Sequence, residues 1–274
     1  MKSPIPLNDL LACSIKAAQA AGNHAFQNHH RRSETIETFD HDVKLKLDVE
    51  CQEKAESVIK SKYPDHAILG EEDTKAPSGS PEPCRMTGQP SPHTWIIDPI
   101  DGTVNFHHGL PWWCASVAVE HNGQVVAGAV YTPQMEETYT ASLEQTAKCN
   151  GKSIKVSTTA RLSDSIILTG MDKKLEPNLK PYEIFSRIAS NARKARITGS
   201  AALDLCQVAC GRADGYFESG IYLWDVAAAE LIVKQAGGKA EILKHLDNNH
   251  RMIFMASNNH IYSELRKLTA FPAS

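Results

Sequence analysis

The chain has 274 residues, of which 42% are hydrophobic and 22% charged, and these ordinary values exclude a disordered protein or a coiled coil. Its formal net charge is -3 and its lysines and arginines are scattered, which argues against nucleic acid as a main partner. The amino terminus has no sustained apolar run, and the seven cysteines include no C-x-x-C pair, so we expect a cytoplasmic protein with reduced cysteines and no membrane association.

The first predicted elements are helical. Apolar residues recur at helical spacing over residues 7–26 and predict an amphipathic helix. Residues 43–48 alternate and suggest a short extended segment. A second helix is predicted to begin at Asp48 and to stop at Tyr63-Pro64, because proline cannot continue the interior of a helix.

Two apolar strands are each followed directly by carboxylates. Residues 67–69 form the first strand and lead into Glu71, whereas residues 95–97 form the second and lead into Asp98. Between them, residues 74–94 are rich in proline, glycine and serine and predict a long surface loop. Such a loop is either an insertion or a flap over a site.

The segment from Asp98 to Gly102 reads Asp-Pro-Ile-Asp-Gly, which is typical of a turn. An Asp-x-x-Asp turn can present Asp98, Asp101 and the carbonyl of Ile100 to a hard cation such as Mg²⁺. An isolated pair of this kind is more often an ordinary turn or a helix cap. A metal site is therefore predicted only if further acidic residues join the pair.

An antiparallel sheet is predicted next. Runs of strand-forming residues at 114–120 and 124–131 flank Asn122-Gly123, and a second Asn-Gly pair follows a strand near residues 138–141. Asn-Gly favours the turns of tight hairpins. We therefore predict an N-terminal α+β part over residues 1–155, which carries most of the candidate metal ligands.

From residue 160 onwards, strands and helices alternate. The predicted helices and strands lie at 165–168, 181–191, 196–197, 201–210, 216–218, 224–233 and 252–255. These elements define a C-terminal α/β part over residues 156–274, in which Asp225 begins a helix.

Acidic residues at the ends or beginnings of the predicted elements could face one crevice. They are Asp48, Glu71, Glu72, Asp98, Asp101 and Asp225. Four or more such groups provide enough oxygen ligands for two or three divalent cations, which can bridge a phosphate and activate a water. The helix start at Asp225 would also favour a phosphate, although an N-cap is the simpler interpretation of that residue.

Three motifs of this chain closely resemble the signatures of the inositol monophosphatase family. They are Gly70-Glu71-Glu72, the stretch Trp95-Ile96-Ile97-Asp98-Pro99-Ile100-Asp101-Gly102-Thr103-Val104-Asn105-Phe106, and Trp224-Asp225-Val226-Ala227-Ala228-Ala229. The similarity also covers residues 199–206 and 211–218. The central motif is long and specific, which makes a chance match implausible.

The resemblance implies a layered αβαβα sandwich of the sugar-phosphatase type and a Mg²⁺-dependent, Li⁺-sensitive phosphomonoesterase that forms a homodimer. It assigns the first metal ion to Glu71, Asp98 and the Ile100 carbonyl. It assigns the second ion to Asp98, Asp101 and Asp225, with a weaker third ion beside Glu71. Mn²⁺ is an alternative to Mg²⁺.

The same resemblance implies catalytic and substrate-binding roles. Glu71 and Thr103 would orient the nucleophilic water, with Asp48 hydrogen-bonded to Thr103. The amides of Gly102 and Thr103 would hold the phosphate of the substrate. Other positions match those where family members contact substrate hydroxyls, namely Gly199, Ser200, Ala201 and Glu218. The implied reaction is in-line attack of water on phosphorus, without a phosphoenzyme.

One segment departs from the family pattern. The family usually reads V-T-x-x-D, whereas this chain reads Val43-Lys44-Leu45-Lys46-Leu47-Asp48.

Inositol 1-phosphate is the favoured substrate among small polyol and sugar phosphates. The alternatives are 3′-phosphoadenosine 5′-phosphate, fructose 1,6-bisphosphate and histidinol phosphate, and a non-catalytic regulatory relative is a less favoured interpretation.

Overall fold

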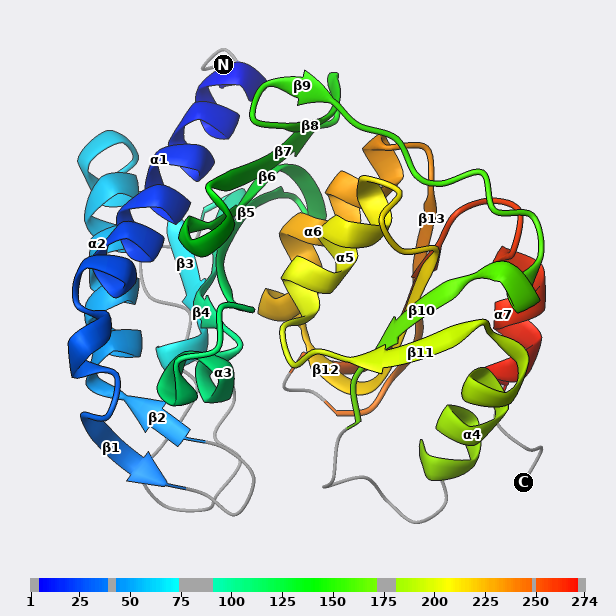
Figure 1. Cartoon of the computed structure of the whole chain (residues 1–274). Coiled ribbons are helices and arrows are strands. Elements are labelled where there is room, and N and C mark those ends of the chain that lie inside the picture. The colour runs from blue at the N-terminus through cyan, green and yellow to red at the C-terminus, as the bar shows by residue number, and fades with distance from the viewer. Residues whose placement is uncertain (1–4, 39–42, 74–90, 172–180, 248–249, 271–274) are drawn as a thin grey trace.

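The computed structural model describes residues 5–38, 43–73, 91–171, 181–247 and 250–270. The predicted flap over residues 74–94 lies largely outside these ranges. Within them, two sheets and three helical layers form a five-layer αβαβα sandwich (Figure 1). The fold class predicted from the sequence is therefore confirmed.

Helices form the outer and central layers. The first sheet is covered on its outer face by α1 (Leu7–Gln27) and α2 (Lys46–Lys62). The central layer contains α5 (Ala201–Ala209) and α6 (Leu223–Gln235), which lie between the sheets (Figure 1). The second sheet is flanked on its far side by α4 (Pro181–Asn191) and α7 (Tyr262–Leu268).

The larger sheet has seven strands in sequential order, and all pairs are antiparallel except the first. Its strands are β3 (Ala67–Gly70), β4 (His93–Asp101), β5 (Cys114–His121), β6 (Gln124–Thr132), β7 (Glu137–Ser142), β8 (Gln145–Cys149) and β9 (Lys152–Ser153). The hairpin predicted at Asn122-Gly123 is present, and both residues adopt positive φ.

The smaller sheet has the strand order β11-β10-β12-β14-β13. The pairs of β10 with β11 and β12 are parallel, and the other two pairs are antiparallel. Its strands are β10 (Ile166–Thr169), β11 (Lys194–Ile197), β12 (Gly215–Tyr222), β13 (Lys239–His245) and β14 (Arg251–Ser257). A separate pair, β1 (Thr35–Thr38) and β2 (Val43–Leu45), precedes α2.

Most predicted elements are found, and two differences stand out. The sequence prediction missed β1 and β13. It also placed a turn directly after Ile97, whereas β4 continues to Asp101. Pairing with β5 is interrupted between Asp98 and Asp101, so Pro99 lies in an irregular part of the strand where a missing N–H is tolerated.

One hydrophobic core joins the two sheets through the central helices. Ile96 from β4 and Phe254 from β14 belong to the same buried cluster as the apolar residues of α5 and α6. At Gly128 on β6, a Cβ would lie only 3.0 Å from the Cα of Ala228, which shows how closely α6 approaches the sheet. The two parts predicted at residue 155 share this core, and their boundary stays a prediction.

Candidate active site

Three aspartates converge at the carboxyl end of β4. Asp98 and Asp101 come from that strand, and Asp225 lies in the first turn of α6. One carboxylate oxygen from each residue lies within 4.8 Å of the other two. Asp98 and Asp101 are buried. A cluster made only of oxygen ligands suits hard divalent cations such as Mg²⁺ or Mn²⁺.

The irregular end of β4 allows its two aspartates to belong to one cluster. Asp98 pairs with Ser116 on β5, and regular pairing resumes only at Asp101 with Cys114. The amide of Ile100 donates to the Asp98 carboxylate at 3.1 Å. Such bulges bend a strand and redirect side chains, and they occur frequently beside active sites.

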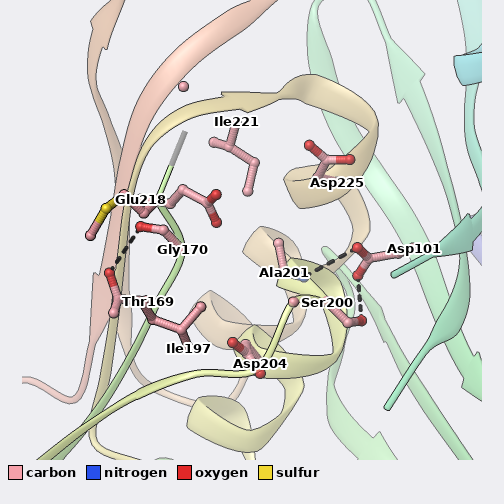
Figure 2. A pocket seen from close by; sticks show the side chains of 13 residues that line it. Asp101, Thr169, Gly170, Ile197, Ser200, Ala201, Asp204, Glu218, Ile221 and Asp225 are labelled. Atoms are coloured by element: carbon pink, nitrogen blue, oxygen red, sulfur yellow. Dashed lines mark hydrogen bonds between the residues drawn. The ribbon is translucent and has the colours of Figure 1, made fainter. Parts of the chain in front are cut away.

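Asp101 is held by the beginning of α5. Its carboxylate accepts hydrogen bonds from the Ser200 hydroxyl at 2.7 Å and from the Ala201 amide at 3.2 Å (Figure 2). The Ala202 amide also donates to it, at 2.7 Å. The Cys114 thiol donates to it at 3.6 Å. Asp101 therefore satisfies two of the free amides of the helix start, although it lies on a distant strand.

Glu71 and Asp225 lie beside this pair. Glu71 follows β3, whose last residue Gly70 pairs with Ile97 in parallel register, so Glu71 lies next to Asp98 along the sheet edge. The Asp225 carboxylate accepts a hydrogen bond from the Tyr222 amide at 2.8 Å. The predicted ligands from both halves of the chain are thus brought together.

The carboxylates repel one another. Burial raises the pKa of Asp98 well above its ordinary value, and the charges of Glu71, Asp101 and Asp225 raise this pKa further. Burial also raises the pKa of Asp225. A bound divalent cation would reverse this cost, because it favours the ionised form of every carboxylate around it. The donor chemistry and the electrostatics of the cluster therefore fit a metal centre.

Thr103 and Asp48, the other predicted catalytic residues, have partners close to them in the chain. The Thr103 hydroxyl, at the start of α3 (Thr103–His108), donates to the Ile100 carbonyl at 2.9 Å. The buried Asp48 carboxylate accepts a hydrogen bond from the Leu45 amide at 2.7 Å at the start of α2. The predicted hydrogen bond between Asp48 and Thr103 stays a prediction.

A pocket of about 280 Å³ adjoins the cluster (Figure 2). Its lining includes Asp101, Asp225 and the four predicted contacts to substrate hydroxyls, namely Gly199, Ser200, Ala201 and Glu218. The predicted phosphate contacts, Gly102 and Thr103, are not among the lining residues. Tyr216 donates a hydrogen bond to Glu218, and burial raises the pKa of this carboxyl to about 7. At Gly170 a Cβ would lie 2.0 Å from the Glu218 carboxyl carbon, so only glycine leaves room for that group.

Two polar residues that link the halves of the site were not predicted from the sequence. Asp204 lines the pocket and accepts hydrogen bonds from the Trp112 indole at 3.0 Å and from the Thr198 hydroxyl. Asn105 donates to the carbonyls of Trp112 and Thr198, each at 2.8 Å. The signal that could have identified Asp204 is that it is the single charged residue in the mostly apolar sequence of α5.

A comparison with protein families gives the decisive observation. A model of the inositol monophosphatase family matches residues 7–269, nearly the whole chain. The chain belongs to the inositol monophosphatase family. The resemblance inferred from the sequence motifs is confirmed.

Relatives in the inositol monophosphatase family carry two different names. "Nus factor SuhB" of Haemophilus influenzae is 39% identical over 236 residues, which are 85% of this chain and 84% of the relative. "Inositol monophosphatase" of Dictyostelium discoideum is 36% identical over 240 residues, 85% of each chain. The alignments cover most of both sequences, so the similarity concerns the whole fold.

Solved structures of inositol monophosphatase relatives have the same fold. The extragenic suppressor protein SuhB of Bartonella henselae has a TM-score of 0.85 at 29% identity, with 97% of this chain and 100% of that chain covered. The inositol monophosphatase of Thermotoga maritima has a TM-score of 0.79 at 33% identity, with 95% of this chain and 96% of that chain covered.

Among the described helices, none has the length and apolar character needed to cross a membrane.

Proposed function

We propose that this protein is a phosphatase that hydrolyses the phosphomonoester of a small polyol or sugar, with inositol 1-phosphate as the favoured substrate. Membership of the inositol monophosphatase family supports a phosphatase. The observation that carries the proposal is the convergence of Asp98, Asp101 and Asp225 beside a polar pocket. Clustered carboxylates next to a concave site are typical of metal-assisted phosphoryl transfer.

The residues around the cluster fit two or three Mg²⁺ ions, or Mn²⁺ in their place. Glu71, Asp98 and the Ile100 carbonyl would hold the first ion. Asp98, Asp101 and Asp225 would hold the second, and a weaker third ion would bind beside Glu71. Bound ions would supply Lewis-acid stabilisation of phosphate charge and a water of lowered pKa.

The chain itself would position the reactants. Glu71 and Thr103 would orient the water for in-line attack on phosphorus, and Asp48 would support Thr103. The amides of Gly102 and Thr103 would donate to phosphate oxygens. No side chain would be phosphorylated, because the attacking group is water. Most of the rate enhancement would come from positioning and electrostatic stabilisation.

The described lining of the pocket favours a substrate with one phosphate and several hydroxyls. It carries Asp101, Asp204, Glu218 and Asp225 but no lysine or arginine. A second phosphate would therefore find no cationic partner among these residues, which disfavours fructose 1,6-bisphosphate and 3′-phosphoadenosine 5′-phosphate. With a pKa of about 7, Glu218 can either accept a hydrogen bond from a hydroxyl or donate one.

Histidinol phosphate is the second candidate substrate, because its amine is cationic. Glu218 in the described lining would attract that amine in its ionised form, which prevails above about pH 7. Inositol 1-phosphate and histidinol phosphate therefore differ in the charge that the pocket must accommodate. A direct comparison of their kcat/KM values distinguishes the two candidates.

Phosphate release from purified protein tests the proposal. The substrates are inositol 1-phosphate, histidinol phosphate, fructose 1,6-bisphosphate and 3′-phosphoadenosine 5′-phosphate, each with Mg²⁺, with chelator and with added Li⁺. We expect Mg²⁺-dependent, Li⁺-inhibited release with inositol 1-phosphate as the best substrate. Absence of release from all four substrates would reject the phosphatase proposal.

A regulatory protein without catalysis is the alternative from a different class. The name "Nus factor SuhB" of several relatives favours it, because that name describes a factor rather than an enzyme. The carboxylate cluster argues against it, since a purely regulatory protein has no need to bury repelling charges.

We further propose a homodimer, for which analytical ultracentrifugation is the direct measurement.

A further inference from the structure

A buried ion pair lies directly beside Glu71. The Lys44 ammonium on β2 lies 2.6 Å from the Glu72 carboxylate, and only 11% and 5% of the two side chains are exposed. Lys44 belongs to the segment in which this sequence departs from the V-T-x-x-D pattern of the family. The pair is therefore a feature of this chain that the family signature does not explain.

Glu72 is contacted by side chains from two other elements. Lys44 approaches the carboxylate and also donates to the backbone carbonyl at 3.4 Å. The Glu72 amide donates to the side-chain carbonyl of Gln52 on α2 at 3.0 Å. Gln52 lies directly over Gly70, where a Cβ would be only 2.3 Å from its side-chain amide carbon. The turn that contains Glu71 is thus held on both sides.

The charge of Lys44 determines what Glu72 can do. A carboxylate this buried is costly unless a cation or several donors compensate it, and the ammonium supplies that compensation. Glu72 paired in this way adds no net negative charge next to Glu71. The two neighbouring glutamates therefore differ in role, because Glu72 is committed to Lys44 while Glu71 adjoins Asp98.

We propose that Lys44 and Glu72 are positioning residues for Glu71, an inference that rests on the proposed metal centre. The ion pair anchors the turn Glu71–Asp73 to β2, and the hydrogen bond from Glu72 to Gln52 anchors it to α2. This anchoring fixes the Glu71 carboxylate at the sheet edge beside Asp98. Partners that orient metal ligands in this way usually change metal affinity or activity by about 10–100-fold when removed.

The first test measures Mg²⁺ binding by calorimetry on the full-length protein, without substrate. Lys44→Met removes the ammonium but keeps the length of the side chain, and we expect Mg²⁺ to bind about 10-fold more weakly or worse. Lys44→Arg retains the charge and should restore most of the affinity. At saturating Mg²⁺, KM for the substrate should stay unchanged, because neither residue lines the described pocket.

A matched control removes an ion pair that lies away from the cluster. Arg212, beyond the far end of α5, pairs with Glu137 at 2.6 Å. Arg212→Met should lower the melting temperature and leave Mg²⁺ affinity within about twofold of wild type, as expected for an independent site. Glu72→Gln is the second test variant if Lys44→Met fails to fold, and it should also weaken Mg²⁺ binding.

The outcomes separate this inference from the proposed function. Wild-type Mg²⁺ affinity in Lys44→Met and Glu72→Gln would refute the positioning role and leave the phosphatase proposal intact. Wild-type protein that binds Mg²⁺ but releases no phosphate would reject the phosphatase, and the variants would still decide the positioning role. Wild-type protein that binds no Mg²⁺ would reject both.

Discussion

The buried charge of Asp98, which the proposed catalysis requires, destabilises the metal-free fold. The side chain is buried, and the charges of Glu71, Asp101 and Asp225 raise its pKa together with that burial. The metal-free protein therefore holds charges that repel one another. Sites of this kind commonly lower stability in return for activity.

Asp98→Asn tests this conflict. The amide keeps the shape of the carboxyl but removes its charge, so Mg²⁺-dependent turnover should be abolished, as it should in Asp98→Ala. In metal-free buffer, the free energy of unfolding of Asp98→Asn should rise by about 1 kcal/mol or more, because one repelling charge is lost. Activity assays and urea denaturation measure the two effects. Substantial residual turnover in either variant would contradict the metal assignment.

The raised pKa of Glu218 predicts a pH dependence of stability. Burial raises this pKa from 4.5 to about 7, so between these values the folded protein retains a proton that the unfolded chain releases. The contribution of Glu218 to the stability of the metal-free protein should therefore be highest below pH 4.5, fall as pH rises to about 7, and level off above it. This carboxyl should account for about 3 kcal/mol of that loss.

Glu218→Gln isolates this contribution, because Asp98, Asp225 and Asp204 also have raised pKa values and act in the same direction. Denaturation of both proteins at pH 5 and pH 8 should show a smaller loss of stability in the variant. Equal losses in the two proteins would mean that Glu218 titrates normally.

Among the elements, α5 is tied to the site through its beginning. Asp101 from β4 accepts hydrogen bonds from its first two amides and from the Ser200 hydroxyl that precedes them. The helix start and the metal-ligand candidate therefore fix each other. A change at the helix start should alter metal binding without touching a proposed ligand.

Ser200→Ala tests this link. Loss of a hydrogen bond to a charged group should lower the free energy of unfolding by about 2 kcal/mol. Mg²⁺ affinity, measured without substrate, should fall by about 10-fold. Ser165→Ala is the control, because its buried hydroxyl donates to a neutral carbonyl, that of Leu162. If both variants bind Mg²⁺ equally well, Ser200 does not position Asp101.

The elements that the sequence predicted correctly are those with strong local signals. The Asn122-Gly123 hairpin follows from a turn preference, and α1 follows from its apolar spacing. The exposed strand β1 lacked such a signal, because no face of it is buried. The continuation of β4 through Pro99 depends on its pairing with β5, which no local pattern reveals.

The candidate metal ligands could be predicted from the sequence, but the contacts that hold them in place could not. Asp98, Asp101 and Asp225 could be identified from motifs, and the structure places them together. The contact between Ser200 and Asp101 and the approach of Lys44 to Glu72 join residues that are far apart in sequence. Such contacts depend on tertiary packing, which local sequence patterns do not specify.

Across the whole molecule, the central helices make the two sheets dependent on each other. Residues of α5 and α6 share one buried cluster with Ile96 of the larger sheet and Phe254 of the smaller one. Neither sheet can therefore expose its inner face without uncovering a large apolar surface. The predicted parts 1–155 and 156–274 should unfold together.

Calorimetry checks this expectation. In metal-free buffer the protein should unfold in one transition, with a calorimetric enthalpy close to the van't Hoff enthalpy. Tryptophan fluorescence and far-UV circular dichroism should give the same midpoint in urea. Two separated transitions would show that the parts fold independently.

The location of Asp225 has a consequence for incomplete chains. Asp98 and Asp101 are synthesised well before Asp225, which lies with α6 in the second half of the sequence. A chain that is terminated early, or cleaved before α6, lacks both the third carboxylate and a helix of the central layer. Under the proposed function, such fragments would neither retain Mg²⁺ nor turn over substrate, so measured activity would come only from molecules that extend through α6.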